Sequence, residues 1–222
     1  ISDLFAPGVR GTTILTLSMT TICLTTVWAF LFFSNQVLRA LPEVKAMAAV
    51  SPVIELEACM QAIERRENRI YEWNFVRELK ARMRRKETHW PGLFDLTKLD
   101  AIRTVREFDN VFTAPHFGFV DAEDYYYRCS AMRIADRIAV PALIITAEDD
   151  PFVPPGPFRS PILEANPHIE LHITKHGGHC GFLADRSADD DGYWAETQIV
   201  AFAERQHATR SRDVRRQNSE VN

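Results

Sequence analysis

The chain has 222 residues, enough for one good-sized domain with a substantial core. Hydrophobic residues make up 46% and charged residues 25%, which is ordinary for a soluble globular protein. The net charge of −4 excludes the basic character typical of a nucleic-acid-binding protein, so we expect no nucleic-acid partner. The four cysteines are scattered without a CxxC pair, which favours the reducing cytoplasm over a disulfide framework or a zinc motif.

The first 34 residues form an apolar segment that admits two interpretations. Gly11–Leu38 holds no charged residue, and Ile14–Phe33 is apolar over a length that could span a bilayer. Arg39 and Lys45 would then lie on the cytoplasmic side. The segment is also rich in threonine, a β-branched residue that suits a strand. Residues 1–34 are therefore either a buried strand and helix or a membrane span that associates the chain with a membrane through Ile14–Phe33.

After this segment the chain alternates between apolar and helical patterns. Val44–Val50 reads as a short buried strand that ends at Ser51-Pro52. The following elements are predicted, in chain order: a helix from Leu56 to about Lys86, a break at Pro91-Gly92, a short helix over Asp100–Phe108, a loop over Thr113–Phe119 and a helix over Ala122–Cys129.

The last third of the chain holds its clearest strands. Ala142–Ala147 is an apolar strand that ends in Glu148-Asp149-Asp150-Pro151, and Ile169–Thr174 is a second strand. Tyr193–Arg205 reads as an amphipathic helix, and the polar residues 207–222 as a disordered tail. Strands separated by helical stretches predict an α/β fold with a mostly parallel sheet and helices on both faces.

Two residue types suited to catalysis follow consecutive strands. Asp150 stands just after Ala142–Ala147, and His179 stands in a glycine-flanked loop after Ile169–Thr174. The carboxyl ends of parallel strands meet at one edge of a sheet, so both side chains can reach one site. A hydrolase that activates a serine needs a histidine base, and a carboxylate that orients the histidine. The order and spacing favour this interpretation over a simple turn and a loop histidine.

A histidine cluster offers a metal-dependent alternative. His172, His176 and His179 form an HxxxHxxH pattern, but His172 falls within a predicted strand and no HExxH helix accompanies it. We therefore expect neither a metal nor another cofactor, with a zinc hydrolase as the third-ranked possibility.

The segment from Asn35 to Arg205 resembles a known family over most of its length. The residues that carry the resemblance are Ser51-Pro52, Glu55-Leu56-Glu57-Ala58-Cys59, Arg106-Glu107-Phe108-Asp109, Thr113-Ala114-Pro115, Gly118-Phe119, Asp121-Ala122, Asp124-Tyr125-Tyr126, Ser130-Ala131, Asp149-Asp150-Pro151-Phe152, Gly177-Gly178-His179 and Gly181-Phe182. This pattern is similar to the YheT-like branch of the α/β-hydrolases, which are esterases and acylglycerol lipases.

The resemblance implies a partial α/β-hydrolase domain over residues 35–206 with a helical cap at about 55–130. It implies Asp150 as the triad acid and His179 as the base, with Asp149 the less favoured acid. It also implies a small ester or lipid as the substrate. The upstream strands of the family fold have no counterpart here, so the sequence resembles an N-terminally truncated member.

The family's GxSxG nucleophile turn is not recognisable in this sequence. Counting back from Asn35 places Leu31 where the serine belongs, and the flanking glycines are missing. Ser18 follows an apolar stretch and is the better substitute; Ser34 lies three positions late. The leading hypothesis is therefore a carboxylic-ester hydrolase with Asp150, His179 and a weakly placed nucleophile, Ser18. The alternative is a catalytically inactive binding or scaffold protein that keeps the fold.

One further stretch bears on membranes. The basic residues in the range 77–86 could contact anionic lipid headgroups. A solvated helix face is the competing interpretation, because glutamates dilute the charge.

Overall fold

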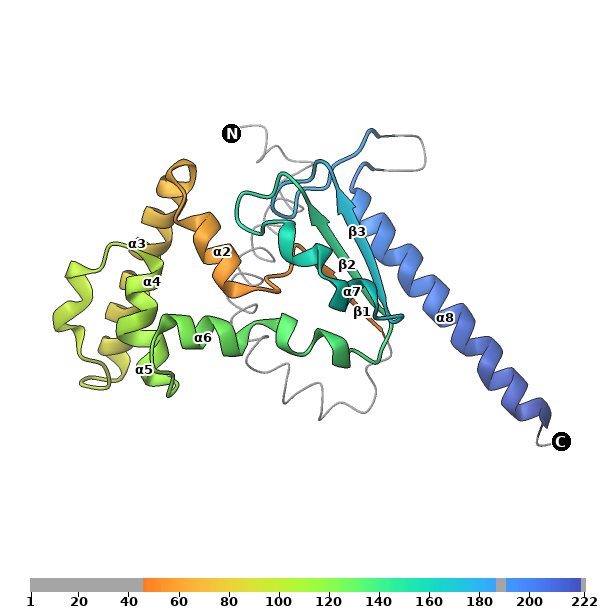
Figure 1. Cartoon of the computed structure of the whole chain (residues 1–222), viewed down its shortest axis with the longest axis horizontal. Helices are drawn as coiled ribbons and strands as arrows, with labels where there is room; N and C mark the ends of the chain where they lie inside the picture. The colour runs from red at the N-terminus through yellow and green to blue at the C-terminus, as the bar shows by residue number, and fades with distance from the viewer. Residues whose placement is uncertain (1–45, 187–190, 221–222) are drawn as a thin grey trace. The chain divides into compact units, whose positions relative to one another are not determined.

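A three-stranded parallel sheet organises the structure, a computed structural model that describes residues 46–186 and 191–220. The strands are β1 (Met47–Val50), β2 (Ala142–Ala147) and β3 (Ile169–Thr174), hydrogen-bonded in the order β1-β2-β3 (Figure 1). The predicted bounds of β2 and β3 are confirmed, and β1 occupies the second half of its predicted strand. The apolar segment of residues 1–34, with Leu31, Ser18 and Ser34, lies outside the described residues.

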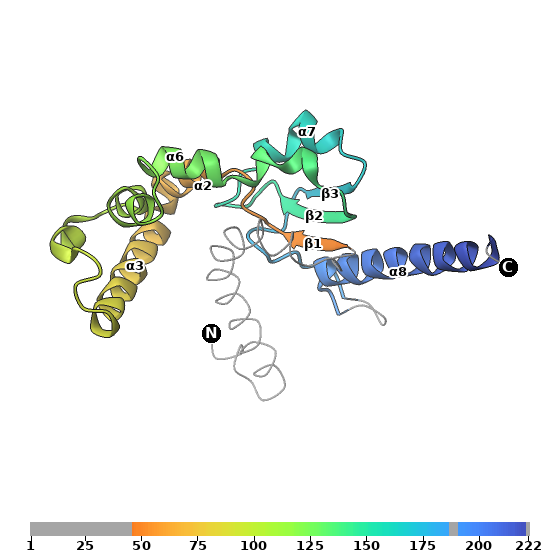
Figure 2. The same ribbon diagram turned by 90° about the horizontal axis from the view of Figure 1, so that it is seen from below.

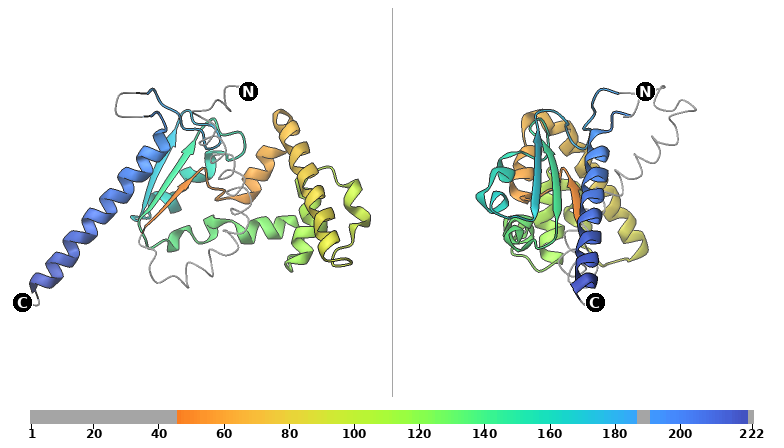
Figure 3. Two further views of the ribbon diagram at one scale, coloured as in Figure 1. Left: turned by 180° about the vertical axis from the view of Figure 1, so that it is seen from behind. Right: turned by 90° about the vertical axis from the view of Figure 1, so that its right-hand side faces the viewer.

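Helices cover both faces of the sheet, as the sequence predicts. Every residue of β2 is buried, and its side chains alternate between two clusters. Leu143 packs in one cluster with Phe202 of α8 (Trp194–Glu220), whereas Ile144 packs in the other, which includes a leucine of α7 (Pro161–Glu164). Figures 2 and 3 show α7 and α8 on opposite faces of the strands. The predicted α/β architecture, a parallel sheet with helices on both faces, is thus confirmed.

The chain between β1 and β2 forms a helical insertion, a name used here for Leu56–Cys129. Its elements are α2 (Leu56–Ile63), a 3-10 helix (Arg66–Asn68), α3 (Arg69–His89), a 3-10 helix (Leu96–Ala101), α4 (Val105–Phe108), a π-helix (Asp109–Thr113), α5 (Ala114–His116) and α6 (Ala122–Cys129). The insertion has a hydrophobic core of its own, built around Met60, Leu99, Phe112 and Tyr126. Three short 3-10 helices complete the described elements, two before β2 (Ala131–Arg133 and Ala135–Arg137) and one before α7 (Gly156–Arg159).

The first predicted helix is divided in the structure. Residues 56–86 were expected as one helix, but α2 ends at Ile63 and α3 begins at Arg69. Arg65 is extended, with φ −63° and ψ 148°. The buried Asn68 side chain donates a hydrogen bond to the carbonyl oxygen of Ala62, in the last turn of α2. The prediction of helix for this stretch is therefore confirmed, but the prediction of a single continuous helix is wrong.

The predicted loop at Thr113–Phe119 is helical in its first half. The prediction is wrong there because a helical backbone runs without a break from α4 through the π-helix into α5, and Pro115 lies within it. Gly118 ends the helix with φ +77°, a left-handed conformation that glycine adopts without strain. The short helix expected over Asp100–Phe108 is a 3-10 helix followed by α4, which Thr104 caps by accepting a hydrogen bond from the Glu107 N–H.

The C-terminal end of the chain also departs from expectation. The sequence predicts a disordered tail over residues 207–222, but α8 continues to Glu220. Extending an existing helix costs far less than nucleating one, and this stretch is rich in helix-favouring arginine. Across residues 46–186 and 191–220, no helix has both the length and the apolar character to cross a membrane.

Candidate functional site

Asp150 and His179 meet at the carboxyl edge of the sheet. Asp150 follows β2 and His179 follows β3, and Asp150 Oδ2 lies 2.9 Å from His179 Nδ1. The Asp150 side chain is fully buried, whereas 25% of the His179 side chain is exposed. The parallel pairing of β2 with β3 brings the two loops together, as the sequence predicts. The carboxylate is thus shielded from water while the ring stays accessible.

The loop after Asp150 holds the carboxylate in its charged form. Asp150 Oδ1 accepts hydrogen bonds from the backbone N–H groups of Phe152 at 2.8 Å and Val153 at 2.9 Å. Burial alone would raise the pKa of this carboxyl, but the hydrogen bonds from His179 and from the two amides outweigh burial and lower the pKa. Asp150 is therefore an anion at neutral pH that can orient an imidazole and stabilise its protonated form.

A tight turn presents His179. The Gly177 carbonyl oxygen accepts hydrogen bonds from the N–H groups of Gly181 at 3.0 Å and Phe182 at 3.1 Å. A Cβ on Gly177 would lie 2.6 Å from ring atoms of Phe182, so no larger residue fits there. Cys180, directly after the histidine, has φ +67°, a strained backbone for a residue with a side chain.

Asp149 anchors the same loop without touching His179. Its Oδ1 accepts a hydrogen bond of 2.8 Å from the Gly178 N–H, and its Oδ2 lies 3.4 Å from Nδ1 of the exposed His176. The Gly178 hydrogen bond is the main reason that the pKa of Asp149 is lowered. Of the two neighbouring aspartates, Asp150 is thus the one paired with His179.

The helical insertion reaches this site through Phe152. The Phe152 ring packs edge-on against His179, with ring centroids 5.4 Å apart. It also packs against Tyr71 of α3 at 5.0 Å and Phe75 of α3 at 5.9 Å. A continuous aromatic path therefore runs from α3 to the histidine.

The three histidines of the HxxxHxxH pattern do not converge. His172 Nε2 lies 3.0 Å from Glu170, His176 pairs with Asp149, and His179 with Asp150. In the part of the chain that the structure describes, no group of three histidine, cysteine, aspartate or glutamate side chains is arranged to hold a metal ion. The zinc alternative thus has no support from the geometry of these residues.

Ser51 is a feature that sequence reasoning missed. It follows β1 directly, is 5% exposed, and has φ +46°, a left-handed backbone that is rare outside glycine. Its hydroxyl has no hydrogen-bond partner among the described residues. The only sequence signal was the Ser51-Pro52 pair in the resemblance, because backbone strain and side-chain burial cannot be read from residue types. Strain and an unpartnered buried hydroxyl at the carboxyl edge mark a candidate functional position.

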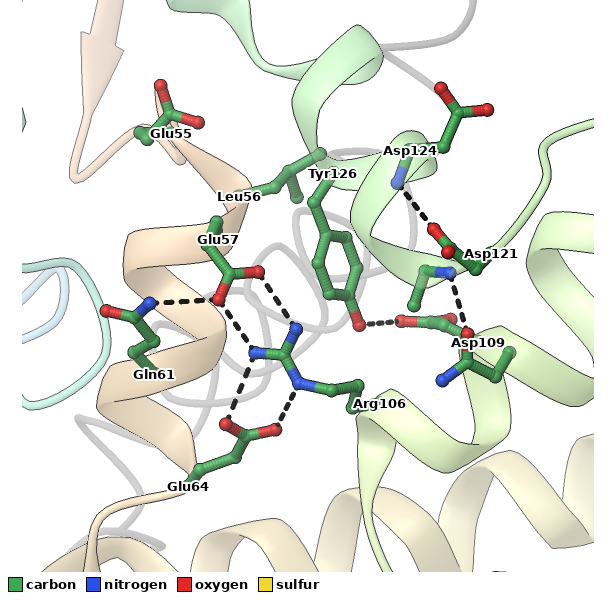
Figure 4. A network of polar contacts seen from close by, with 12 residues as sticks. Glu55, Leu56, Glu57, Gln61, Glu64, Arg106, Asp109, Asp121, Asp124 and Tyr126 are labelled. Carbon is green, nitrogen blue, oxygen red and sulfur yellow. Dashed lines mark hydrogen bonds and ion pairs between the residues drawn. The ribbon is translucent and has the colours of Figure 1, made fainter.

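A polar network holds the insertion together (Figure 4). Arg106 of α4 donates to both carboxylate oxygens of Glu57, at 2.9 and 3.0 Å, and to Glu64 at 2.7 and 3.2 Å. These hydrogen bonds raise the pKa of the Arg106 guanidinium and lower that of the Glu57 carboxyl. The arginine therefore ties α4 to both ends of α2.

The same network has a buried carboxylate. Asp109, 2% exposed, accepts hydrogen bonds of 2.6 Å from the hydroxyls of Tyr126 and Thr113. Burial raises its pKa in spite of these two donors. Arg106 and Asp109 belong to the Arg106–Asp109 motif of the resemblance, and Tyr126 to another of its motifs. Their role in the structure is to join α4, the π-helix and α6.

Known proteins resemble this chain over much of its length. YheT of Escherichia coli, whose name classes it with the esterases, is 40% identical over 162 residues, which cover 70% of this chain and 46% of YheT. The medium-chain fatty acid ethyl ester synthase/esterase 2 of Saccharomyces cerevisiae is 41% identical over 108 residues, which cover 49% of this chain and 23% of the yeast protein. The monoacylglycerol lipase of the same yeast is 42% identical over 89 residues, covering 40% of this chain and 20% of the lipase.

The chain spans about half the length of YheT and less of the two yeast proteins. No family model matches it. These three relatives are all named as esterases or lipases. The parallel sheet with helices on both faces agrees with the α/β-hydrolase fold. Over 70% of its length, the chain is similar to the YheT-like branch of the α/β-hydrolases.

Proposed function

We propose that this chain carries the acid and the base of a serine hydrolase acting on carboxylic esters. The observation that supports this most is the hydrogen bond of 2.9 Å between Asp150 and His179, with the carboxylate buried and the ring accessible. The names of the relatives favour an ester or lipid substrate. In this proposal residues 35–206 are the hydrolase domain, and the helical insertion contributes its cap, about residues 55–130.

The geometry suits one division of labour. Asp150 accepts a hydrogen bond from the Nδ1–H of His179 and so fixes the tautomer in which Nε2 is free to accept a proton. Nε2 takes the proton of the attacking serine hydroxyl as that oxygen bonds to the ester carbonyl carbon. The protonated ring then gives the proton to the departing alcohol. Water, activated in the same way, hydrolyses the acyl-enzyme and releases the carboxylic acid.

The nucleophile in this proposal is Ser18, which lies outside the described residues. Ser34 is the second choice from the sequence. Ser51 becomes a third choice, because its strained backbone directly after a parallel strand is the kind of conformation that a nucleophile turn uses. A covalent probe can distinguish the three, since only an activated serine reacts.

The test combines hydrolysis and labelling. The purified chain is assayed with a short-chain p-nitrophenyl ester beside His179→Ala, Asp150→Asn and Ser18→Ala, and a fluorophosphonate adduct is located by mass spectrometry. We expect hydrolysis that falls by about 10³–10⁴ in kcat for His179→Ala and Asp150→Asn, and an adduct on Ser18. His176→Ala, which removes a neighbouring exposed histidine, is the matched control and should retain activity. Equal activity of parent and His179→Ala would disprove the proposal.

A catalytically inactive binding or scaffold protein is the second candidate. The observation that favours it is the absence of glycine throughout residues 12–91, where the nucleophile turn belongs. In that case the parent shows only background hydrolysis and no adduct forms on any serine, while the chain still binds a non-hydrolysable ester analogue.

A further inference from the structure

The first turns of α3 expose large apolar side chains. Ile70 is 77% exposed, Trp73 60% and Tyr71 50%. Ile70 and Trp73, three positions apart, are neighbours on one side of the helix. Large apolar surfaces exposed in this way often have a function. Val76 and Met83 of the same helix are buried in the core of the insertion. The helix thus has one face packed in the protein and another apolar face turned to solvent.

The same helix is the most basic element of an acidic chain. Over Arg69–His89 there are seven lysines and arginines against three glutamates, whereas the whole chain has a net charge of −4. Ile70, Trp73, Arg77 and Arg84 follow one another at spacings of three, four and seven, so they share one side of the helix. The Arg77 guanidinium lies over the Trp73 ring, 5.1 Å from its centroid. The apolar surface is therefore continuous with arginines that form exposed ion pairs, Arg77 with Glu78 at 3.0 Å and Arg84 with Asp100 at 2.5 Å. The helix as a whole keeps an excess of basic residues.

This combination fits one partner chemistry. Aromatic and aliphatic side chains enter the boundary between headgroups and acyl chains, and arginines beside them attract anionic headgroups. A substrate acyl chain would not need the charge. Tryptophan and arginine are also common at protein interfaces, so self-association is one outcome that the test distinguishes.

We propose that the exposed face of α3, defined by Ile70, Trp73, Arg77 and Arg84, docks on the surface of an anionic phospholipid bilayer. The inference concerns membrane binding and does not depend on the chain being catalytically active.

The test is flotation of the full chain with phosphatidylcholine vesicles, with and without 30 mol% phosphatidylglycerol, a composition on the order of natural anionic membranes. We expect binding to the anionic vesicles that weakens as salt rises, because salt screens the arginines. The double variant Ile70→Ser/Trp73→Ser should bind at least about tenfold more weakly, since two anchoring side chains are lost. Arg77→Glu/Arg84→Glu should lose the preference for phosphatidylglycerol.

The matched control is Val120→Ser/Val200→Ser, which removes two exposed aliphatic side chains elsewhere (87% and 57% exposed) and should bind like the parent. Circular dichroism of each variant excludes misfolding. Undiminished binding of Ile70→Ser/Trp73→Ser overturns the proposal in favour of another anchor, such as residues 11–38. If the parent does not bind anionic vesicles, the proposal is wrong. A parent that is dimeric, with a monomeric double variant and no loss of vesicle binding, assigns the face to self-association instead.

Discussion

The side-chain amide of Asn68 donates a hydrogen bond of 2.7 Å to the carbonyl oxygen of Pro151, the residue that follows the buried Asp150. The same amide nitrogen donates at 2.8 Å to Ala62 at the end of α2. Asn68 is 6% exposed, so both bonds are shielded from water. One side chain therefore ties the break between α2 and α3 to the loop of the candidate site, 83 residues away along the chain.

Asn68→Ala should destabilise the protein. It removes both hydrogen bonds and leaves two carbonyl groups without this donor, at a cost of about 1–3 kcal/mol in the free energy of unfolding. Urea denaturation followed by circular dichroism measures the change. Asn74→Ala, at an exposed position of α3, is the control and should change stability by less than about 0.5 kcal/mol. Equal effects of both substitutions would contradict the bridging role of Asn68.

Gly177→Ala should damage the loop that presents His179. The added Cβ would lie 2.6 Å from the Phe182 ring and 3.1 Å from the Ala147 side chain, so the turn has to shift. Overpacking of this kind costs about 1–3 kcal/mol. The control is Gly156→Ala, where a Cβ meets nothing within 4 Å, and thermal denaturation compares the two variants. An unchanged melting temperature for Gly177→Ala would show that the turn is looser than described.

The sequence predicts the sheet and the Asp150–His179 pair for one physical reason. Apolar runs such as Ala142–Ala147 are strong local signals, and parallel pairing then brings the ends of consecutive strands together. The break between α2 and α3 escapes prediction because it depends on Asn68 contacting Pro151, a pairing distant in sequence. Local patterns carry no information on such a contact.

The polar network of the insertion shows the same limit. Asp109 and Tyr126 stand out in the sequence only through the family resemblance, and nothing local reveals that they meet in a hydrogen bond of 2.6 Å. The strained backbone of Ser51 is likewise invisible to residue patterns, since serine is ordinary in turns. What sequence reasoning misses is therefore mostly long-range polar contact and local strain.

Tyr126→Phe tests the buried network through pH. The substitution removes one of the two hydroxyl donors to Asp109, which should cost about 1–3 kcal/mol at neutral pH. It should also raise further the pKa of Asp109, which burial already raises. Because the pKa of Asp109 is raised, its charged carboxylate is the form that destabilises the folded protein. The loss of stability caused by Tyr126→Phe is therefore present at high pH, where Asp109 is charged. That loss shrinks as pH falls through the folded-state pKa. Tyr127→Phe, at an exposed tyrosine, is the control.

Asp150→Asn should change the pH dependence of stability with the opposite sign. Hydrogen bonds from His179, Phe152 and Val153 outweigh burial and lower the pKa of Asp150 in the folded protein, so its charged form is stabilising. That stabilisation is fully present above the unfolded-state pKa of about 4 and disappears as pH falls through the lower folded-state pKa. The free energy of unfolding of the parent should therefore exceed that of Asp150→Asn most clearly near neutral pH, well above the unfolded-state pKa of about 4. This difference in stability between the parent and Asp150→Asn should become smaller as the pH falls below about 4.

Urea midpoints measured from acid to neutral pH provide the check, with Asp136→Asn at an exposed carboxylate as the background. Asp136 accepts none of the hydrogen bonds that hold the His179 loop, so its substitution should leave the pH profile close to that of the parent. A stability difference for Asp150→Asn that widens toward low pH would mean that burial dominates and that the carboxyl is protonated in the folded state. Asp150 could then not orient His179 as an anion, and the acid–base pair on which the hydrolase proposal rests would have to be abandoned.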